Sequence, residues 1–338
     1  MTRLSVVFTA LACLALGACE SKPCAQPDAA SPEPPRAVSP AEAALTPALQ
    51  AFNAVSLPRV AELFCEDHEL VLPVAGQPPL RGRAGILSAL QSVQLAFPDA
   101  QLRLRRVLDN GADWAAELSF SGTHQAEFLG VPASQKRIDF HFALLGQVRE
   151  GRLARTHVVG NGLALLRQLK GDAEHLPPGP VVPERPELAV GPGPEAQVAA
   201  VRALFEAFDT GDVAALKALV TEDVSVLALG DGKLLSGSAE LGEALLQERQ
   251  AFQGGVRIER VFAAGDCAAA LVVVEGKLIG DTGPYKASGR SFREAGLDVF
   301  RFSGGKIRTW NNYRNVLDVL TQLGLFPPPA PAPAPGGK

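Results

Sequence analysis

The residues best suited to chemistry in this 338-residue chain are a few histidines and the amide and aromatic side chains near them. Side chains alternate along a strand, so Trp114 and His124 share one face of the segment 114–124 with mostly apolar residues between them. His124 therefore points toward an apolar interior, where an imidazole that titrates near about 6.5 is suited to acid–base catalysis. A core histidine bonded to a backbone carbonyl fits the same pattern, and both interpretations stay open.

A second set of polar side chains falls on later segments. His157 shares a strand face with Asn161 and is a candidate ligand contact, although an exposed strand end fits equally well. Toward the C-terminus, aromatic and amide groups either contact a ligand or close the core: Tyr285, Asn311, Tyr313 and Asn315. No two histidines have the i, i+2 or i, i+4 spacing typical of a metal site. We therefore expect no metal and no cofactor.

The remaining polar and sulfur-bearing residues are expected to be structural. Asp298 and Arg290 are predicted to form an ion pair that Glu294 can join. His141 is expected on a solvated strand face, His68 in a loop and His175 in a linker. Two cysteines have apolar neighbours and are expected to be buried as small hydrophobic residues: Cys65 and Cys267.

Matching stretches at a nearly constant separation indicate that these residues belong to two copies of one unit. Ala51-Phe52-Asn53 matches Ala207-Phe208-Asp209 at a separation of 156, and Gly151-Arg152-Leu153 matches Gly305-Lys306-Ile307 at 154. Chance matches would scatter, so the chain contains an internal duplication. Pro-rich stretches separate the parts: a tether at 19–44, the first copy at 45–170, a linker at 171–194, the second copy at 195–326 and a tail at 327–338.

Each copy has the same predicted order of elements. An amphipathic helix comes first, followed by a short strand and another helix. Four strands and a short C-terminal helix complete the copy. In the first copy the four strands are predicted at 101–108, 114–124, 137–148 and 153–160. Helices followed by a run of hairpin-connected strands indicate the α+β class.

Motifs in both copies resemble those of SnoaL-like polyketide cyclases. The first copy has Gly122-Thr123-His124 followed by Phe128-Leu129-Gly130-Val131-Pro132, and both copies end in a Leu-x-Gln-Leu type motif, at 165–169 and 319–324. The resemblance implies the nuclear transport factor 2-like fold. Two tandem cone-shaped domains are then expected, each a curved antiparallel sheet wrapped around N-terminal helices, with a pocket at the wide end.

The resemblance also bears on activity. Cyclases of this family use an Asp at the end of the last strand as general base, and the matching positions here are Asn161 and Asn315. An amide has no useful basicity near neutral pH, so the base is missing from both copies. His124 resembles the family's active-site histidine, whereas the second copy has Leu278 in its place.

Two functions follow from these residues. The first is binding of a small apolar ligand or a partner segment in a cone pocket. The alternative is an isomerase, dehydratase or cyclase-like enzyme that acts on a carbonyl-containing small molecule in the first copy. There His124 would be the acid/base, with Trp114 and Asn161 orienting the carbonyl. Because cones of this superfamily often pair through their sheets, the two copies are also expected to form an intramolecular pseudodimer.

The N-terminal segment predicts export. Residues 1–18 contain one Arg and an apolar run typical of a signal peptide, and Leu16-Gly17-Ala18-Cys19 resembles the bacterial lipobox. A lipid anchor on Cys19 would hold the body at a membrane of the cell envelope. Glu20, rather than Asp, favours the outer membrane. With a net charge of -4 and no stretch dense in Lys or Arg, the chain is not expected to bind nucleic acid.

Overall fold

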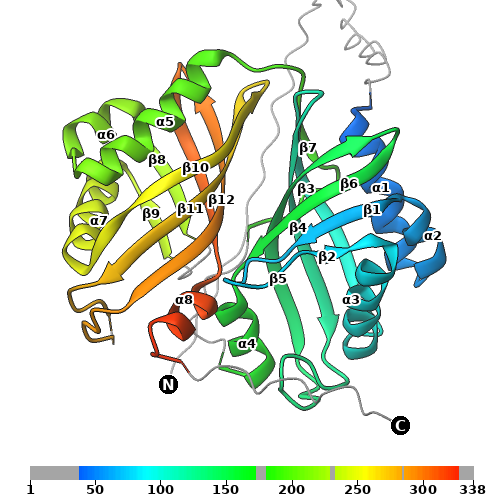
Figure 1. Ribbon diagram of the computed structural model, residues 1–338. Helices are drawn as coiled ribbons and strands as arrows, with labels where there is room; N and C mark the ends of the chain where they lie inside the picture. The colour runs from blue at the N-terminus through cyan, green and yellow to red at the C-terminus, as the bar shows by residue number, and fades with distance from the viewer. Residues whose placement is uncertain (1–37, 173–179, 229–232, 284, 327–338) are drawn as a thin grey trace, which may run out of the picture. The chain divides into compact units, whose positions relative to one another are not determined.

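The computed structural model describes residues 38–172, 180–228, 233–283 and 285–326 (Figure 1). The predicted signal peptide, the lipidation site Cys19, most of the tether, His175 and the tail lie outside the described residues. Within the described part, no helix combines the length and the hydropathy needed to cross a membrane.

The first copy begins with helices and continues as strands, as predicted. Its elements are α1 (Pro40–Asn53), α2 (Leu57–Glu62), β1 (Phe64–Val71), β2 (Leu80–Arg81), α3 (Gly82–Ala96), β3 (Gln101–Asp109), β4 (Trp114–Thr123), β5 (Arg137–Arg149), β6 (Arg152–Gly160) and α4 (Gly162–Lys170). α1 begins after Ser39, whose Oγ accepts a hydrogen bond from the Glu42 backbone N–H at 3.1 Å, with Pro40 in the first turn.

The second copy repeats this order. Its elements are α5 (Glu195–Thr210), α6 (Val213–Leu219), β8 (Val220–Ala228), β9 (Lys233–Ser236), α7 (Ser238–Ala251), β10 (Phe252–Ala264), β11 (Cys267–Leu278), β12 (Ser291–Ser303), β13 (Lys306–Arg314) and α8 (Val316–Gln322). α5 ends at Gly211, whose left-handed φ of 73° lets the chain turn into α6.

Each copy forms one curved sheet with its long helices on one face (Figure 1). The strand orders are β2-β1-β6-β5-β4-β3-β7 and β10-β11-β12-β13-β8-β9. The predicted α+β class with curved sheets is confirmed, but the sheets are mixed rather than purely antiparallel. β1 pairs in parallel with β6, and β8 with β13, because the early strand of each copy adds to the last strand of the meander.

The Pro-rich linker contains a strand that was not predicted. β7 (Glu187–Val190) pairs in parallel with β3, so that Glu187 lies beside Arg106 and bonds its guanidinium at 2.8 Å. Ala189 is buried against both sheets' apolar residues. Four residues next to Pro186 give too short a pattern for a strand prediction.

Apolar packing occupies both faces of the second sheet. On the helix side, Phe205 of α5 and Leu241 of α7 pack in one cluster with Phe300 of β12. Full burial of one such side chain contributes about 1.5–3 kcal/mol to stability. On the opposite face, another cluster joins buried residues of both copies, among them Leu145 and Val159 of the first and Leu271, Val299 and Tyr313 of the second.

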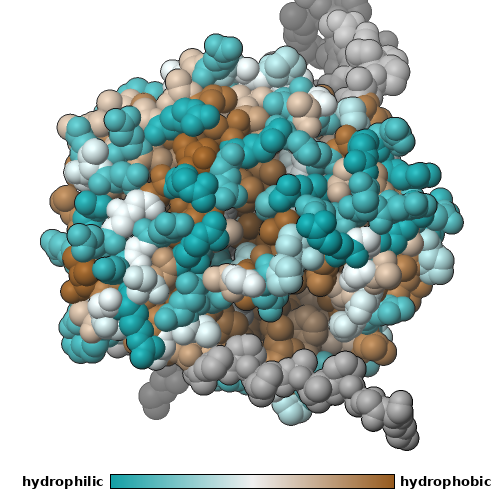
Figure 2. Space-filling model, viewed as in Figure 1, coloured by the Kyte–Doolittle hydropathy of each residue, from teal (hydrophilic) through white to brown (hydrophobic). Residues whose placement is uncertain are grey.

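Hydrophilic side chains cover most of the face drawn in Figure 2, with hydrophobic residues in the gaps between them. The two cysteines of the described residues, Cys65 and Cys267, are both free and buried, which confirms their predicted role as small core residues.

Candidate functional site

The second copy has a cavity of about 570 Å³, open to solvent on one side, between its helices and its sheet. Its walls come from α5, α7, α8 and from the strands β8 to β13. Most lining side chains are apolar, including Phe205, Phe208, Leu245, Val274, Phe292 and Trp310. Drug-sized ligands occupy pockets of this size and composition, with a few polar groups that set orientation.

One group of polar side chains comes from the cavity-facing sides of β12 and β13. Trp310, Asn312 and Arg314 alternate along β13 and line the cavity. Behind them, the fully buried carboxylate of Asp298 accepts hydrogen bonds from the Trp310 indole N–H at 2.7 Å and from Arg314 at 2.8 Å. The expected ion pair of Asp298 therefore forms with Arg314, not with Arg290.

A glycine makes room for this ion pair. Gly296 of β12 lies directly opposite Arg314 of β13, and a Cβ at position 296 would collide with the guanidinium. Arg314 can therefore lie flat over the sheet beside Asp298. Any side chain at position 296 would push the guanidinium out of the ion pair.

Glu294 is the most deeply buried acidic residue of the cavity lining. It lines the cavity, is only 7% exposed, and its Oε1 has no hydrogen-bond partner among the described residues. Burial raises the pKa of Glu294 to about 7, and the guanidinium of Arg314 and the Asn315 backbone N–H oppose that rise. A carboxyl with this pKa exchanges a proton near neutral pH.

Asp209 also lines the cavity, but its role is structural. Its Oδ1 accepts a hydrogen bond from the Val256 backbone N–H at 2.9 Å and so ties α5 to β10. The matching residue of the first copy, Asn53, bonds the Leu102 backbone at 2.8 and 2.9 Å in the same way. Burial raises the pKa of Asp209, while this hydrogen bond opposes the rise.

The first copy replaces the polar groups with aromatic rings. At the separation of 154, Glu294 corresponds to Phe140 and Arg314 to Gly160. Phe140 and Phe142 stack nearly parallel, with ring centroids 6.1 Å apart, and a Cβ at Gly160 would meet both side chains. The first copy thus has the large residue on β5 and the glycine on β6, whereas the second copy has the glycine on β12 and the large residue on β13. Of these two strand pairs, only that of the second copy contains a buried ion pair at this place.

This arrangement corrects two sequence expectations. An interior without an inward carboxylate was expected in both copies, yet Glu294 faces the cavity of the second. The predicted trio of His124, Trp114 and Asn161 is also not assembled as one site. Ten residues of extended strand separate Trp114 from His124, roughly 30 Å at the usual rise per residue, because the two mark opposite ends of β4.

His124 is a fully buried residue of the first copy. Its Nδ1 accepts a hydrogen bond from the Ser134 backbone N–H at 3.2 Å and lies 3.0 Å from the Ser134 hydroxyl. An acceptor at Nδ1 leaves the proton of a neutral imidazole on Nε2, which is buried without a partner among the described residues. The ring packs against Phe97, and His124 is not among the residues that line the cavity of the second copy. Trp114, 2% exposed, packs in a core cluster with residues of α1.

Two of the other predicted histidines, His68 and His141, are buried, and His157 is half-buried. His157 pairs with Leu145 across β5 and β6 and so lies on the sheet face that carries the shared apolar cluster, not in the cone interior. Burial lowers the pKa of His157 to about 4. His141, expected in solvent, is 8% exposed on β5, and His68 lies in β1 with its Nδ1 2.8 Å from the Leu153 carbonyl oxygen.

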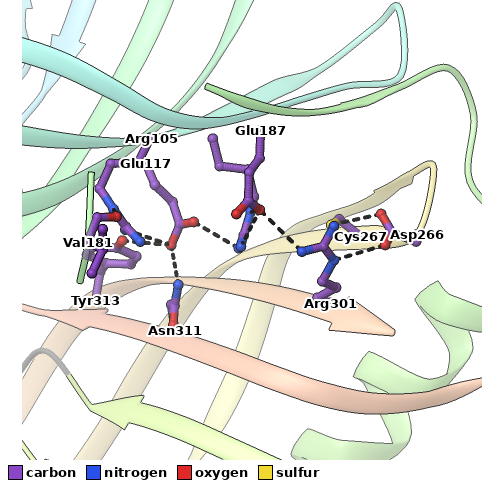
Figure 3. A network of polar contacts seen from close by, with 10 residues as sticks. Arg105, Glu117, Val181, Glu187, Asp266, Cys267, Arg301, Asn311 and Tyr313 are labelled. Carbon is purple, nitrogen blue, oxygen red and sulfur yellow. Dashed lines mark hydrogen bonds and ion pairs between the residues drawn. The ribbon is translucent and has the colours of Figure 1, made fainter. Parts of the chain in front are cut away.

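Two predicted ligand contacts bond the first copy instead of lining the cavity. Asn311 Nδ2 and Tyr313 Oη donate hydrogen bonds to the fully buried Glu117 of β4, at 2.6 and 2.7 Å (Figure 3). Glu117 is also 3.0 Å from Arg106, which bonds Glu187 in turn. Burial, followed by the Glu117 carboxylate, raises the pKa of Tyr313 well above its ordinary value. Of the four residues predicted in the second copy, only Tyr285 lines the cavity.

Comparison with known proteins identifies the family. The sequence profile described as SnoaL-like polyketide cyclase matches residues 43–169 and again residues 198–323. These two regions together make up well over half of the chain.

The chain belongs to the SnoaL-like polyketide cyclase family. Among solved structures, a candidate polyketide cyclase from Xanthomonas campestris pv. campestris is 27% identical over 38% of this chain and 97% of that chain, with a TM-score of 0.36. A candidate polyketide cyclase from Pseudomonas putida KT2440 is 28% identical over 36% of this chain and 94% of that chain, with a TM-score of 0.34. IdmH from Streptomyces antibioticus, also a candidate polyketide cyclase, is 28% identical over 39% and 99%, with a TM-score of 0.35. No curated protein matches this chain.

The SnoaL-like motifs of this chain have structural roles in both copies. Asn161 caps α4, its Oδ1 accepting hydrogen bonds from two backbone N–H groups at 3.1 and 3.2 Å. Asn315 precedes α8, accepts from the Gly162 N–H at 3.2 Å and donates to the Pro73 carbonyl at 2.8 Å. Gln168 and Gln322 each bond both backbone groups of one strand residue, at 2.7–2.9 Å, and so fix the terminal helix to β5 or β12.

Sequence reasoning missed Glu117 and the inward orientation of Glu294. Alternation puts Glu117 on the face of β4 opposite to Trp114, and no role was predicted for that face. Ala115 and Ser119 share that face, and small side chains on both sides of a charge are a signal of close packing. In the described part of the chain, no group of three His, Cys, Asp or Glu residues is arranged to hold a metal ion.

Proposed function

We propose that the second copy is the binding module of this protein and holds one small, largely apolar molecule. The observation that carries this proposal is the cavity of about 570 Å³, lined by aromatic and aliphatic side chains over a buried Asp298–Arg314 pair. An apolar cavity gains free energy when a ligand displaces its water, and a few fixed polar groups orient that ligand. Family membership adds that the fold carries a pocket, without specifying chemistry.

In this proposal the first copy supports the second as the other half of an intramolecular pseudodimer. Two observations favour that role. Its Glu117 accepts hydrogen bonds from Asn311 and Tyr313 of β13, the strand whose other face lines the cavity. Phe140 and Phe142 occupy the place of the polar floor in the first copy. Sedimentation of the full chain as a monomer is the expected result, whereas a compact dimer of tandem chains would argue against the intramolecular pairing.

We also propose that the body is tethered to the cell envelope through a lipid on Cys19, with the outer membrane favoured. The support is the lipobox-like Leu16-Gly17-Ala18-Cys19 and the following Glu20. Cys19→Ala should move the protein from the membrane fraction to the soluble fraction. An unchanged distribution would contradict the anchor.

Native mass spectrometry tests the binding role with a matched pair of variants. Ala244 of α7 lines the cavity, and Ala89 is its counterpart in α3 of the first copy. The protein purified from its own host should carry a small molecule. Ala244→Trp should lose that molecule because the indole fills the cavity, and Ala89→Trp should keep it. Loss in Ala89→Trp alone would place the ligand in the first copy and refute the proposal.

A second candidate function is acid–base catalysis at Glu294, favoured by its buried carboxyl with a pKa of about 7. This places the isomerase or cyclase-like alternative in the second copy, where the cavity lies. The assay is exchange of α-protons of carbonyl compounds in D₂O, followed by NMR. Exchange lost in Glu294→Gln supports this function. Exchange lost in His124→Gln alone supports the first-copy alternative instead.

A further inference from the structure

The cavity of the second copy contains more carboxyl groups than cations. Four acidic residues line it, Asp209, Glu248, Glu275 and Glu294, against only two basic residues, Arg249 and Arg314. Asp298 adds a fifth carboxyl just behind the lining. Glu275 is neutralised from outside the cavity by Arg293 at 3.0 Å, and Asp209 is bonded to the backbone of β10.

The single guanidinium at the floor is already engaged. Arg314 donates to Asp298 at 2.8 Å and to the Tyr313 carbonyl at 2.8 Å. The same guanidinium faces Glu294 and Glu248. Asp298 and Glu294 therefore share this positive charge, and an anionic ligand at the floor would meet their repulsion. The other cation of the lining, Arg249, donates to the Gly254 carbonyl at 3.3 Å.

Glu294 supplies the observation that points to a ligand. Its side chain is more than nine-tenths buried, lines the cavity, and keeps Oε1 without a partner in the described part of the chain. A buried carboxylate oxygen without a hydrogen-bond partner costs free energy that a bound donor would recover. The acceptor-only chemistry of a carboxylate requires that donor to come from the ligand.

Aromatic rings complete the environment of a positive charge. Trp310 meets Phe208 edge-on at 5.5 Å, and Phe205 packs against Trp310 at 6.3 Å. Phe252 and Phe292 add a second ring pair, 5.5 Å between centroids, and all five residues line the cavity. The negative faces of aromatic rings attract ammonium groups, by about 0.5–2 kcal/mol per contact.

We propose that the ligand of this cavity is an organic cation: an apolar molecule with one substituted ammonium group, which Glu294 holds among the aromatic rings. This inference rests on the proposed function, because it assigns the ligand class of the same cavity. Asp298 and Arg314 form the fixed floor beneath the cation, and the remaining apolar wall accommodates the rest of the molecule.

The inference implies proton release on binding. The charged groups that face Glu294 are Arg314 of β13, Asp298 of β12 and Asp318 of α8, and Glu248 of α7 faces the same guanidinium. A bound cation stabilises the carboxylate form of Glu294, whose pKa in the unliganded cavity is about 7. Affinity should therefore fall up to about tenfold for each pH unit below 7. A ligand held by the protonated carboxyl would show the opposite trend.

The test is calorimetric titration of the full chain with three probes of the same shape. Benzyldimethylammonium, which has one N–H donor, is the cation, isobutylbenzene its neutral isostere and phenylmethanesulfonate an anion. We expect the cation to bind at least about tenfold more tightly than the neutral compound at pH 8. Glu294→Gln should remove that preference and keep the neutral binding, while Glu243→Gln, an exposed carboxylate of α7 outside the cavity, should change neither.

Each other outcome refutes the inference in a distinguishable way. Equal binding of the cation and the neutral compound overturns the cation assignment but supports an apolar binding site. Tightest binding of the anion overturns it as well, and so does a cation preference that survives in Glu294→Gln. Ala244→Trp should abolish cation binding without any change of charge. That loss would show that the probe binds in the cavity. If no probe binds, the cation assignment fails. The binding role of the second copy is then tested separately, by native mass spectrometry of the protein purified from its own host.

Discussion

Replacing Glu294 with Gln should change how stability depends on pH. Burial raises the pKa of this carboxyl from 4.5 to about 7, so the folded protein binds its proton more tightly than the unfolded chain does. The stabilisation from that proton is complete below pH 4.5 and is lost as the pH rises through 7. One pKa unit corresponds to about 1.4 kcal/mol, so the loss amounts to about 3 kcal/mol. The glutamine side chain cannot ionise and avoids it.

The assay is urea unfolding followed by tryptophan fluorescence from pH 4 to pH 8, for the wild-type protein, Glu294→Gln and the exposed control Glu243→Gln. The free energy of unfolding of Glu294→Gln, relative to wild type, should rise by about 3 kcal/mol across this range. The contribution of His157 to the free energy of unfolding has the opposite pH dependence, because it is lost as the pH falls from 6.5 toward 4. That contribution is the same in wild type and variant, so it cancels in the difference between them. A difference that stays flat with pH would show that Glu294 is not desolvated, and the reasoning about the cavity would fail.

Three further predictions concern the structural roles assigned above. Tyr313→Phe should lower the free energy of unfolding by about 1–3 kcal/mol, because Glu117 loses a buried donor; an unchanged urea midpoint would contradict this. Asn161→Ala should cost about 1 kcal/mol by removing the cap of α4, measured in the same way, and a neutral result would show that the cap bonds are worth nothing. Burial raises the pKa of Cys267 to about 12, so mass spectrometry should find it unmodified by iodoacetamide at pH 8 in the folded protein and modified in urea; rapid native labelling would refute its burial.

The duplication and the order of elements could be predicted because the same patterns occur twice. Asn53 and Asp209 end their matching stretches, and both bind the backbone of the strand that follows the third helix of the copy, β3 or β10. Gln168 and Gln322 likewise make the same pair of bonds. Such repeated contacts leave repeated residues, which a self-comparison detects.

The inward face of β13 could not be predicted from its own residues. Trp310 and Tyr313 are both aromatic, yet one faces the cavity and the other bonds Glu117. Alternation distinguishes two faces only when one of them meets water. Both faces of this strand are buried, because the sheet packs apolar residues on each side.

The location of the polar site was missed for a different reason. It depends on an exchange of size between paired strand residues, Phe142 with Gly160 in one copy and Gly296 with Arg314 in the other. The register of β12 against β13 decides which residues form such a pair. The sequence does not determine that register, so Glu294 and Asp298 were predicted only as members of an ion pair with Arg290, without a place in the cavity.

A crystal structure of the protein purified from its own host, with nothing added, tests the central claim most directly. We expect electron density for a small molecule in the cavity of the second copy, with a nitrogen-bearing end within hydrogen-bonding distance of Glu294 and near the ring of Trp310. A cavity closed by rearranged side chains, with Glu294 paired to Arg314, or density only in the first copy, would contradict the account.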